Sequence, residues 1–245
     1  MTMRPLEAVV FDAGGILVRL DFEWMSGAVA ELGHAVDAAT LRRAEVEGRR
    51  RYDASGGLAG AEAAPPLGKA GDVRAYFGGM FAAAGVPAGV IDAAVERLLA
   101  RERERGLWAR PMEGAREAID GVLALGLKTA VVSNSDGRAE RHLEASDVRR
   151  GIGFVIDSHV VGIEKPDPRI FALALDRLAV APERALFVGD IRSVDERGAA
   201  AAGMRFVLLD PAGDYAGPDT DAIRAIRELP GWIAERFEPA RAGRA

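Results

Sequence analysis

Residues 8–15 read AVVFDAGG, four apolar residues followed by a carboxylate, an alanine and two glycines. A short continuous run of β-branched and aromatic side chains predicts a strand that is buried on both faces. Asp12 would then stand at the end of that strand, where Gly14 and Gly15 let a ligand approach the backbone closely. An acidic residue at such a point also serves as an ordinary turn or helix cap, so this stretch alone does not define a function.

Four further apolar runs repeat this design along the chain. They cover residues 129–132 (TAVV), 154–156 (FVI), 185–188 (ALFV) and 206–209 (FVLL). Helical patterns lie between them, over residues 113–125, 168–178 and 195–202. Strands that alternate with helices predict an α/β fold with a doubly wound parallel sheet, in which ligands bind beyond the carboxyl ends of the strands.

The stretch from residue 21 to 107 breaks this rhythm. Helical patterns cover residues 22–32, 38–50, 73–84 and 89–105, and a segment rich in Gly, Ala and Pro over 54–71 predicts a loop or hinge. We therefore expect an all-helical cap over residues 21–107, inserted between two parts of an α/β core at 1–20 and 108–238. Residues 239–245 are expected to form a disordered tail.

Two arginine-rich segments fall within the expected cap, over residues 42–51 and 101–105. Charged residues at helical spacing usually form a solvated helix face with local ion pairs, and we interpret both segments in that way. The alternative is that one or two of these arginines contact an anionic substrate beneath the cap.

Composition excludes several classes of protein. The chain has no cysteine, which excludes disulfides, thiolate metal sites and cysteine nucleophiles. Its net charge of −5 argues against nonspecific electrostatic binding to nucleic acid or to an anionic membrane surface. No apolar run reaches the roughly 18 residues of a membrane span, and the first residues lack the apolar core of a secretion signal. We expect a cytoplasmic protein without membrane or nucleic-acid partners; the sequence gives no indication of the oligomeric state.

Polar residues follow two of the other predicted strands, and another precedes a helix. Asp190 and Asp195 flank a turn after the run at 185–188, so both carboxylates can face one pocket and offer the oxygen ligands that Mg²⁺ prefers. Ser133 ends another strand, where hydroxyl and backbone N–H groups can hold phosphate oxygens. Lys165 offers a positive charge from a proline-stiffened loop just before a helix. Each feature on its own is common in ordinary surface loops.

The four features occur together and in a fixed order: strand-Asp, strand-Ser, Lys-Pro and strand-Gly-Asp-x-x-x-x-Asp. In this order they resemble the haloacid dehalogenase (HAD) superfamily, specifically its members with a helical cap between the first two motifs. The most specific segments are GIEKPDPRIF at 162–171 and VGDIRSVDERGAAAAGM at 188–204. The resemblance runs from about residue 7 to 210 and implies a HAD-like Rossmannoid core.

The resemblance implies a Mg²⁺-dependent phosphatase of a small phosphorylated metabolite. Asp12 would attack phosphorus to form an aspartyl-phosphate that water then hydrolyses, while Lys165 and the metal offset the repulsion between the two anions. The metal ligands implied in this way are Asp12, Asp190, Asp195 and the backbone carbonyl of Gly14. The residues implied to bind the transferring phosphoryl group are Ser133, Asn134 and Lys165, of which Ser133 and Lys165 are also implied to be catalytic.

The first motif departs from the pattern of the phosphatases it resembles. They usually read DxDxT, whereas residues 12–16 read DAGGI, so that Gly14 replaces the second Asp and Ile16 replaces the Thr. That Asp protonates the leaving group and later activates water, and loss of such a group lowers the rate by about 10²–10⁴. Asp21 and Asp136 lie near the expected site in sequence and are candidate replacements.

Two alternatives follow from the same departure. The haloacid dehalogenases proper also lack the second Asp, but they attack carbon and need no metal, so the presence of Asp190 and Asp195 favours the phosphatase. Some sugar-phosphate phosphatases of the superfamily also have Gly at this place. The second alternative is a catalytically weak HAD-like protein that binds a phosphorylated ligand. A cap over the site favours a small substrate in either case.

Overall fold

The computed structural model describes residues 4–55 and 72–239. Within these ranges, six parallel strands form the main sheet in the order β6-β5-β2-β7-β8-β9. Their bounds are β2 Ala8–Phe11, β5 Lys128–Ser133, β6 Val155–Asp157, β7 Ala185–Gly189, β8 Arg205–Leu209 and β9 Ala222–Ile223. All five apolar runs found in the sequence lie in this sheet, and the bounds of each strand differ from those of its run by one residue at most. The predicted α/β fold with a parallel sheet is confirmed.

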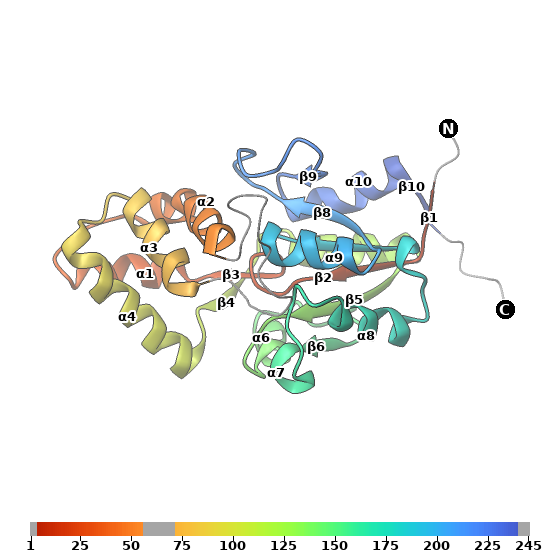
Figure 1. Cartoon of the computed structure of the whole chain (residues 1–245), viewed down its shortest axis with the longest axis horizontal. Helices are drawn as coiled ribbons and strands as arrows, with labels where there is room; N and C mark the ends of the chain where they lie inside the picture. Colours follow the sequence, from red (N-terminus) through yellow and green to blue (C-terminus); the bar gives the residue numbers. More distant parts are fainter. Residues whose placement is uncertain (1–3, 56–71, 240–245) are drawn as a thin grey trace.

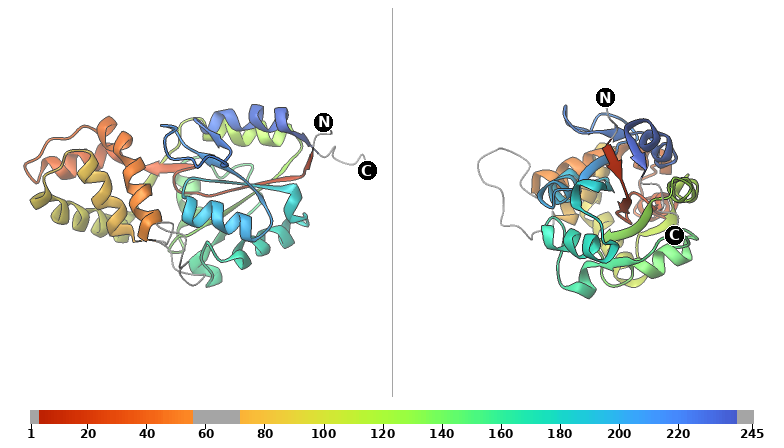
Figure 2. Two further views of the ribbon diagram at one scale, coloured as in Figure 1. Left: turned by 45° about the horizontal axis from the view of Figure 1, so that its top comes forward. Right: turned by 90° about the vertical axis from the view of Figure 1, so that its right-hand side faces the viewer.

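Helices cover both faces of the sheet, which explains why its strands are continuously apolar. Val9 and Phe11 of β2 pack with helices α5 and α10, whereas Ala8 and Val10 pack with α8 and α9 on the other face. Figure 2 (left) shows these helices on opposite sides of the sheet. The helices of the core are α5 Ala115–Ala124, α6 Ala139–Ala145, α7 Ser158–Val161, α8 Pro168–Leu178, α9 Arg197–Ala201 and α10 Leu229–Arg236.

The strands of the sheet are in register where the site forms. Phe11, the last residue of β2, lies opposite Val131 of β5 and Val188 of β7. Because the strands are parallel, the residues that follow β2, β5 and β7 come out at one edge of the sheet. Asp12 and Asp190 therefore start from neighbouring positions.

Four helices lie beyond this edge of the sheet (Figure 1). They are α1 Phe22–Ala30, α2 Ala38–Ser55, α3 Val73–Ala83 and α4 Ala88–Arg105, and the antiparallel strands β3 Val18–Leu20 and β4 Trp108–Pro111 carry the chain to and from them. The helices have an apolar core of their own, in which Phe77, Met80 and Leu98 are fully buried. None of the described helices is both long and apolar enough to span a bilayer.

Some local expectations differ from the structure. Ala54 and Ser55, expected in a loop, belong to α2, and residues 56–71 of that loop lie outside the described residues. The helix expected over 195–202 is a π-helical turn at Arg192–Glu196 followed by α9. Pro239, expected in a disordered tail, ends strand β10 (Phe237–Pro239), which pairs with β1 (Arg4–Leu6); residues 240–245 lie outside the described residues. Strands this short, and with a proline, leave no periodic pattern.

Asp210 anchors the loop that follows β8. It is almost fully buried, and its carboxylate accepts hydrogen bonds from the backbone N–H groups of Gly213 (2.8 Å), Tyr215 (3.0 Å) and Ala216 (3.0 Å). Burial by itself raises the pKa of a carboxyl group, but the three N–H donors outweigh it and hold the pKa of Asp210 below its ordinary value. The charged form of Asp210 therefore stabilises the folded chain.

Asp210→Asn is expected to lower the free energy of unfolding by about 1–3 kcal/mol at pH 7, because the amide cannot accept all three bonds. The contribution of a carboxylate with a lowered pKa is present above its unfolded pKa of about 3.9 and is lost as the pH falls through the folded-state value. Urea unfolding at pH 7 and near pH 3 checks this: the difference from the wild type should shrink at the lower pH. Asp219→Asn, at an exposed position in the same loop, is the control. Equal stability of the Asp210 variant and the wild type at pH 7 would contradict the prediction.

Candidate active site

A cavity of about 400 Å³ lies where the carboxyl edge of the sheet faces the four helices. Its volume is in the usual range for a small-molecule site. The strand ends and loops of the core contribute polar residues that the sequence singled out: Asp12, Gly14, Ser133, Asn134, Lys165, Asp190 and Asp195. The structure thus brings all of these residues to one cavity.

Asp12 is held in place by the sheet itself. Its backbone N–H donates to the carbonyl of Val188 at 2.9 Å, which continues the β2–β7 ladder by one residue. One carboxylate oxygen, Oδ1, accepts from the backbone N–H of Ala13 (2.7 Å) and lies 2.9 Å from the ammonium Nζ of Lys165.

Lys165 lies at the centre of the polar side of the cavity. Its ammonium contacts Oδ1 of Asp12 and Oδ1 of Asp195 (2.7 Å), and its side chain is 1% exposed. Burial disfavours a charged ammonium, but Asp12 and Asp195 outweigh this effect and raise the pKa of Lys165 above its ordinary value. Lys165 is therefore a permanent positive charge at this site.

The backbone of Lys165 is fixed by Asn134. The side-chain oxygen of Asn134 accepts from the N–H of Lys165 at 2.8 Å, and its nitrogen donates to the carbonyl of Lys165 at 2.9 Å. Just beyond, Asp167 caps α8 by accepting from the N–H of Arg169, and Pro168 takes the first helical position. Asn134 therefore uses both ends of its amide to position Lys165, and its direct contact with substrate stays a prediction.

The turn after β7 brings two more carboxylates beside Asp12. Asp195, in the π-helical turn, accepts from the N–H groups of Asp190 and Ile191, both at 3.0 Å, and so folds back under the end of the strand. Carboxylate oxygens of Asp12, Asp190 and Asp195 all lie within 4.8 Å of one another. Gly15 makes room for this cluster: its φ is +76°, and a Cβ there would lie 2.1 Å from Oδ2 of Asp190.

Two of the three carboxyl groups in this cluster have a raised pKa. Burial raises the pKa of Asp12 to about 6 against the opposing effect of Lys165, and burial also raises the pKa of Asp190 well above its usual value against that of Arg49. Three buried carboxylates with hard oxygen donors in one place are the donor set that a small divalent cation prefers. The residues present therefore fit such a cation, and Gly14, expected to offer its carbonyl, lines the same cavity.

Arg49 is a residue of this site that the sequence interpretation assigned to a solvated helix face. It lies on α2 with its side chain 5% exposed, and Nη2 lies 3.3 Å from Oδ2 of Asp190. Nη1 donates to the carbonyl of Leu209 at 3.1 Å, and Glu45 is its ion-pair partner within the helix. The solvated-face interpretation is therefore wrong for Arg49. Glu45, Arg49 and Asp53 follow one another at i, i+4 spacing, so they share one face of α2, and this row was the signal that the sequence offered. In the structure all three contact buried groups.

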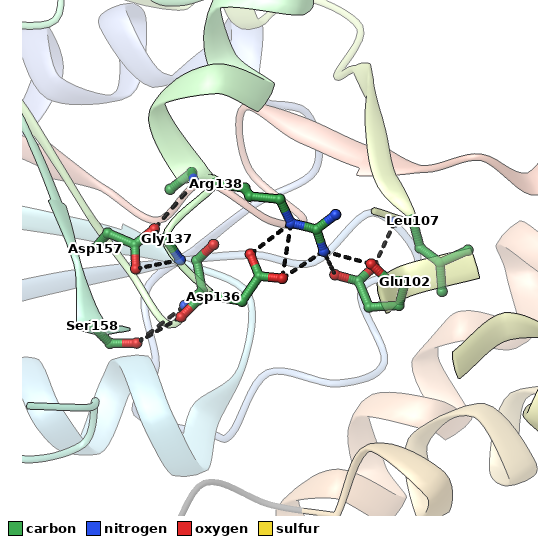
Figure 3. A network of polar contacts seen from close by, with 9 residues as sticks. Glu102, Leu107, Asp136, Gly137, Arg138, Asp157 and Ser158 are labelled. Atoms are coloured by element: carbon green, nitrogen blue, oxygen red, sulfur yellow. Dashed lines mark hydrogen bonds and ion pairs between the residues drawn. The ribbon is translucent and has the colours of Figure 1, made fainter. Parts of the chain in front are cut away.

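A second polar link joins the helices to the core at Arg138 (Figure 3). Its guanidinium pairs with Asp136 (2.5 Å) in the same loop and with Glu102 (3.4 Å) on α4, and also donates to the backbone carbonyl of Glu102. Asp157 holds this loop by accepting from the N–H groups of Gly137 and Ala139, each at 3.1 Å. The end of α4 is thereby tied to the loop after β5.

The two candidates for the missing acid are not placed as acids. The hydrogen bond from Arg138 lowers the pKa of Asp136, which keeps that carboxyl ionised. Asp21 caps α1, pairs with Arg110 at 3.2 Å and is not among the residues that line the cavity.

Glu102 does line the cavity. Burial raises the pKa of its carboxyl group, although the hydrogen bond from the N–H of Leu107 and the charge of Arg138 both act to lower it. The sequence interpretation did not single out Glu102.

Comparison with known proteins adds to this geometry. The family model described as haloacid dehalogenase-like hydrolase matches residues 6–203. "Haloacid dehalogenase-like hydrolase domain-containing protein 3" of Mus musculus is 40% identical over 119 residues, 49% of this chain and 47% of the relative. "Phosphoserine phosphatase" of Thermus thermophilus is 38% identical over 109 residues, 42% of this chain and 43% of the relative. These matches thus span about half the length of each curated relative.

A solved structure supports the same assignment for the fold. The HAD family hydrolase from Deinococcus radiodurans, with bound phosphate and sodium, superposes with a TM-score of 0.60 at 21% identity, over 96% of this chain and 99% of that one. At this identity the likeness concerns the fold alone. Since the family model covers most of the sequence, the chain belongs to the haloacid dehalogenase-like hydrolases.

Proposed function

We propose that this hydrolase is a Mg²⁺-dependent phosphatase that releases phosphate from a small phosphorylated metabolite. The observation that carries the proposal is the buried cluster in which Asp12 shares the Lys165 ammonium with Asp195 and lies within 4.8 Å of Asp190. A nucleophilic carboxylate must approach an anionic phosphate, and a fixed cation beside it reduces their repulsion. The phosphatase-named relative supports the same reaction class.

The chain's own residues divide the work in this proposal. Asp12 attacks phosphorus with a carboxylate oxygen, the bond from phosphorus to the ester oxygen breaks, and water then cleaves the aspartyl-phosphate to return Asp12 and phosphate. Lys165 holds positive charge beside Asp12 throughout, and Ser133, which lines the same cavity, is proposed to bind phosphoryl oxygens. Mg²⁺, when bound by Asp12, Asp190, Asp195 and the Gly14 carbonyl, supplies further positive charge to the phosphoryl group.

The helical segment over residues 21–107 is proposed to act as a cap on this site. Contacts from α2 and α4 reach the core at Asp190, which lines the cavity, and at Arg138, whose partners Glu102 and Asp136 line it. Closure by helices leaves room for a small molecule and keeps bulk water away from the aspartyl-phosphate. The family's small-molecule substrates are consistent with a cavity of about 400 Å³.

A second candidate, a dehalogenase-type hydrolase that attacks carbon without a metal, is favoured by one observation. Arg49 already gives Asp190 a positive partner, so the carboxylate cluster holds two internal cations in the structure. Gly14 agrees with either candidate. The dependence of turnover on Mg²⁺ separates the two.

Hydrolysis of p-nitrophenyl phosphate is expected to need both Mg²⁺ and Asp12. The phenol of this substrate leaves without a proton donor, so the glycine at position 14 should matter least. EDTA should abolish turnover, and Asp12→Asn should lower kcat by about 10³-fold or more. Asp176→Asn, at an exposed position on α8, is the matched control and should behave as the wild type.

Release of halide from a 2-haloacid in EDTA, with no phosphate released from p-nitrophenyl phosphate, would reject the phosphatase in favour of the second candidate. Turnover of neither compound would favour the ligand-binding alternative.

A cation held by Asp190 would compete with Arg49 for that carboxylate. Arg49→Met removes the competing charge while keeping an unbranched side chain, so the Kd for Mg²⁺, measured by calorimetric titration, is expected to fall by about tenfold, or about 1.4 kcal/mol. Arg50→Met is the control, because Arg50 lies next to it on α2 but pairs with Asp214 and Glu47 instead. Weaker Mg²⁺ binding by the Arg49 variant alone would show that Arg49 orients Asp190 instead of competing for it.

A further inference from the structure

The cavity has two chemically different sides. The core contributes the carboxylates, Lys165 and Ser133, whereas α2, α3 and β4 contribute the side chains of Tyr52, Val73, Tyr76 and Trp108. A phosphoryl group attacked by Asp12 lies on the polar side. The leaving group of the substrate therefore faces a wall that is largely aromatic.

Trp108 occupies the place toward which a side chain at position 14 would project. A Cβ on Gly14 would lie 3.1 Å from Cδ1 and 3.3 Å from Nε1 of the indole, and all three of its nearest neighbours are atoms of Trp108. These distances are shorter than ordinary van der Waals contact. The carboxylate absent from position 14 is thus replaced, in space, by an indole ring.

The indole is held in this place from both sides. Trp108 lies in β4, opposite Leu20 of β3, and its ring packs against Tyr76 and Phe77 of α3 with centroids 6.5 Å and 6.1 Å away. Tyr52 lies edge-on to Tyr76 at 6.3 Å, which extends the aromatic surface onto α2. The wall is therefore continuous across two helices and one strand.

Among the described residues, no carboxyl group is one of the three nearest neighbours of a Cβ at Gly14, and the carboxyl groups that line the cavity outside the Asp12 cluster have other surroundings. Asp136 is paired with Arg138, and Glu164 is exposed. Glu102 accepts from the N–H of Leu107 with one oxygen and faces Arg138 with the other. A substrate's leaving group next to Gly14 thus meets an indole where the related phosphatases place an acid.

We propose that Trp108 determines specificity, and that the enzyme acts on phosphate monoesters of planar, weakly acidic hydroxyl groups, namely phenols or enols. This inference rests on the proposed phosphatase function. In the first step the Asp12 oxygen bonds to phosphorus, and the leaving oxygen departs with its electron pair as a phenolate or enolate. The anion takes its proton from water after release, so no acid is needed beside Gly14. The planar body of the leaving group packs against the aromatic wall.

Phenyl phosphate and cyclohexyl phosphate test the proposal as a matched pair, because they have rings of six carbons and differ in planarity and in the acidity of the alcohol. With Mg²⁺, kcat/KM for phenyl phosphate is expected to exceed that for cyclohexyl phosphate by at least about 10²-fold, the lower bound of the contribution of a general acid. Values within threefold of each other would overturn the proposal.

Trp108→Leu tests the role of the indole itself. It is expected to lower kcat/KM for phenyl phosphate by about tenfold, the upper range of one aromatic contact, while the value for cyclohexyl phosphate changes by less than about threefold. Trp24→Leu is the control, because Trp24 also packs in the helical core but does not line the cavity. Thermal unfolding of both variants verifies that they fold. An unchanged ratio between the two substrates would remove Trp108 from the proposal.

Glu102→Gln tests the strongest rival. If Glu102 protonated the leaving group, this variant would lose cyclohexyl phosphate turnover and keep p-nitrophenyl phosphate turnover, and the proposal would fall. Hydrolysis of p-nitrophenyl phosphate that depends on Asp12 and Mg²⁺ but shows no preference for phenyl over cyclohexyl phosphate would leave the phosphatase standing and reject this inference. Absence of any turnover dependent on Asp12 would reject both.

Discussion

The buried ammonium of Lys165 is the charge on which the arrangement of the site depends. Asp12 and Asp195 could not both be buried as carboxylates without it, because an unpaired charge is strongly disfavoured away from water. The surrounding structure serves to hold it: Asn134 fixes its backbone from both ends, and Asp167 starts the helix just beyond. Burial raises the pKa of Asp12 to about 6 even beside this cation, and Asp12, Asp190 and Asp195 together offer carboxylate oxygens to a further cation.

Charge also connects the helices of residues 21–107 with the core. Arg49 reaches Asp190 from α2, Asp53 on the same helix accepts from the N–H of Ser193, and Arg138 holds the end of α4. These contacts are polar, unlike the apolar cores on either side. The ion pair between Arg49 and Asp190 is thus one of the contacts that hold α2 against the core.

Gly14 and Trp108 are direct neighbours in the structure, and a side chain at position 14 would meet the indole. A glycine at position 14 removes a carboxylate, and the indole fills the space in front of it. The change puts a planar indole, which carries one N–H group, where a carboxyl group would project. The indole favours an aromatic leaving group by packing, and the missing carboxyl group at position 14 favours one that leaves without a proton, so both effects select the same class.

The sequence by itself determined the order of the strands' apolar runs, the parallel α/β architecture and the cluster of polar residues at one sheet edge, because these follow from local periodicity and from where each strand stops. It did not reveal the paired strands β1 and β10, which are too short for a pattern, or the buried position of Arg49 in a segment that looks solvated. Nor did it show Trp108 above Gly14, 94 residues away in the chain. Only the tertiary structure decided these, because each depends on how the helices pack across the carboxyl edge of the sheet or on contacts between distant ends of the chain.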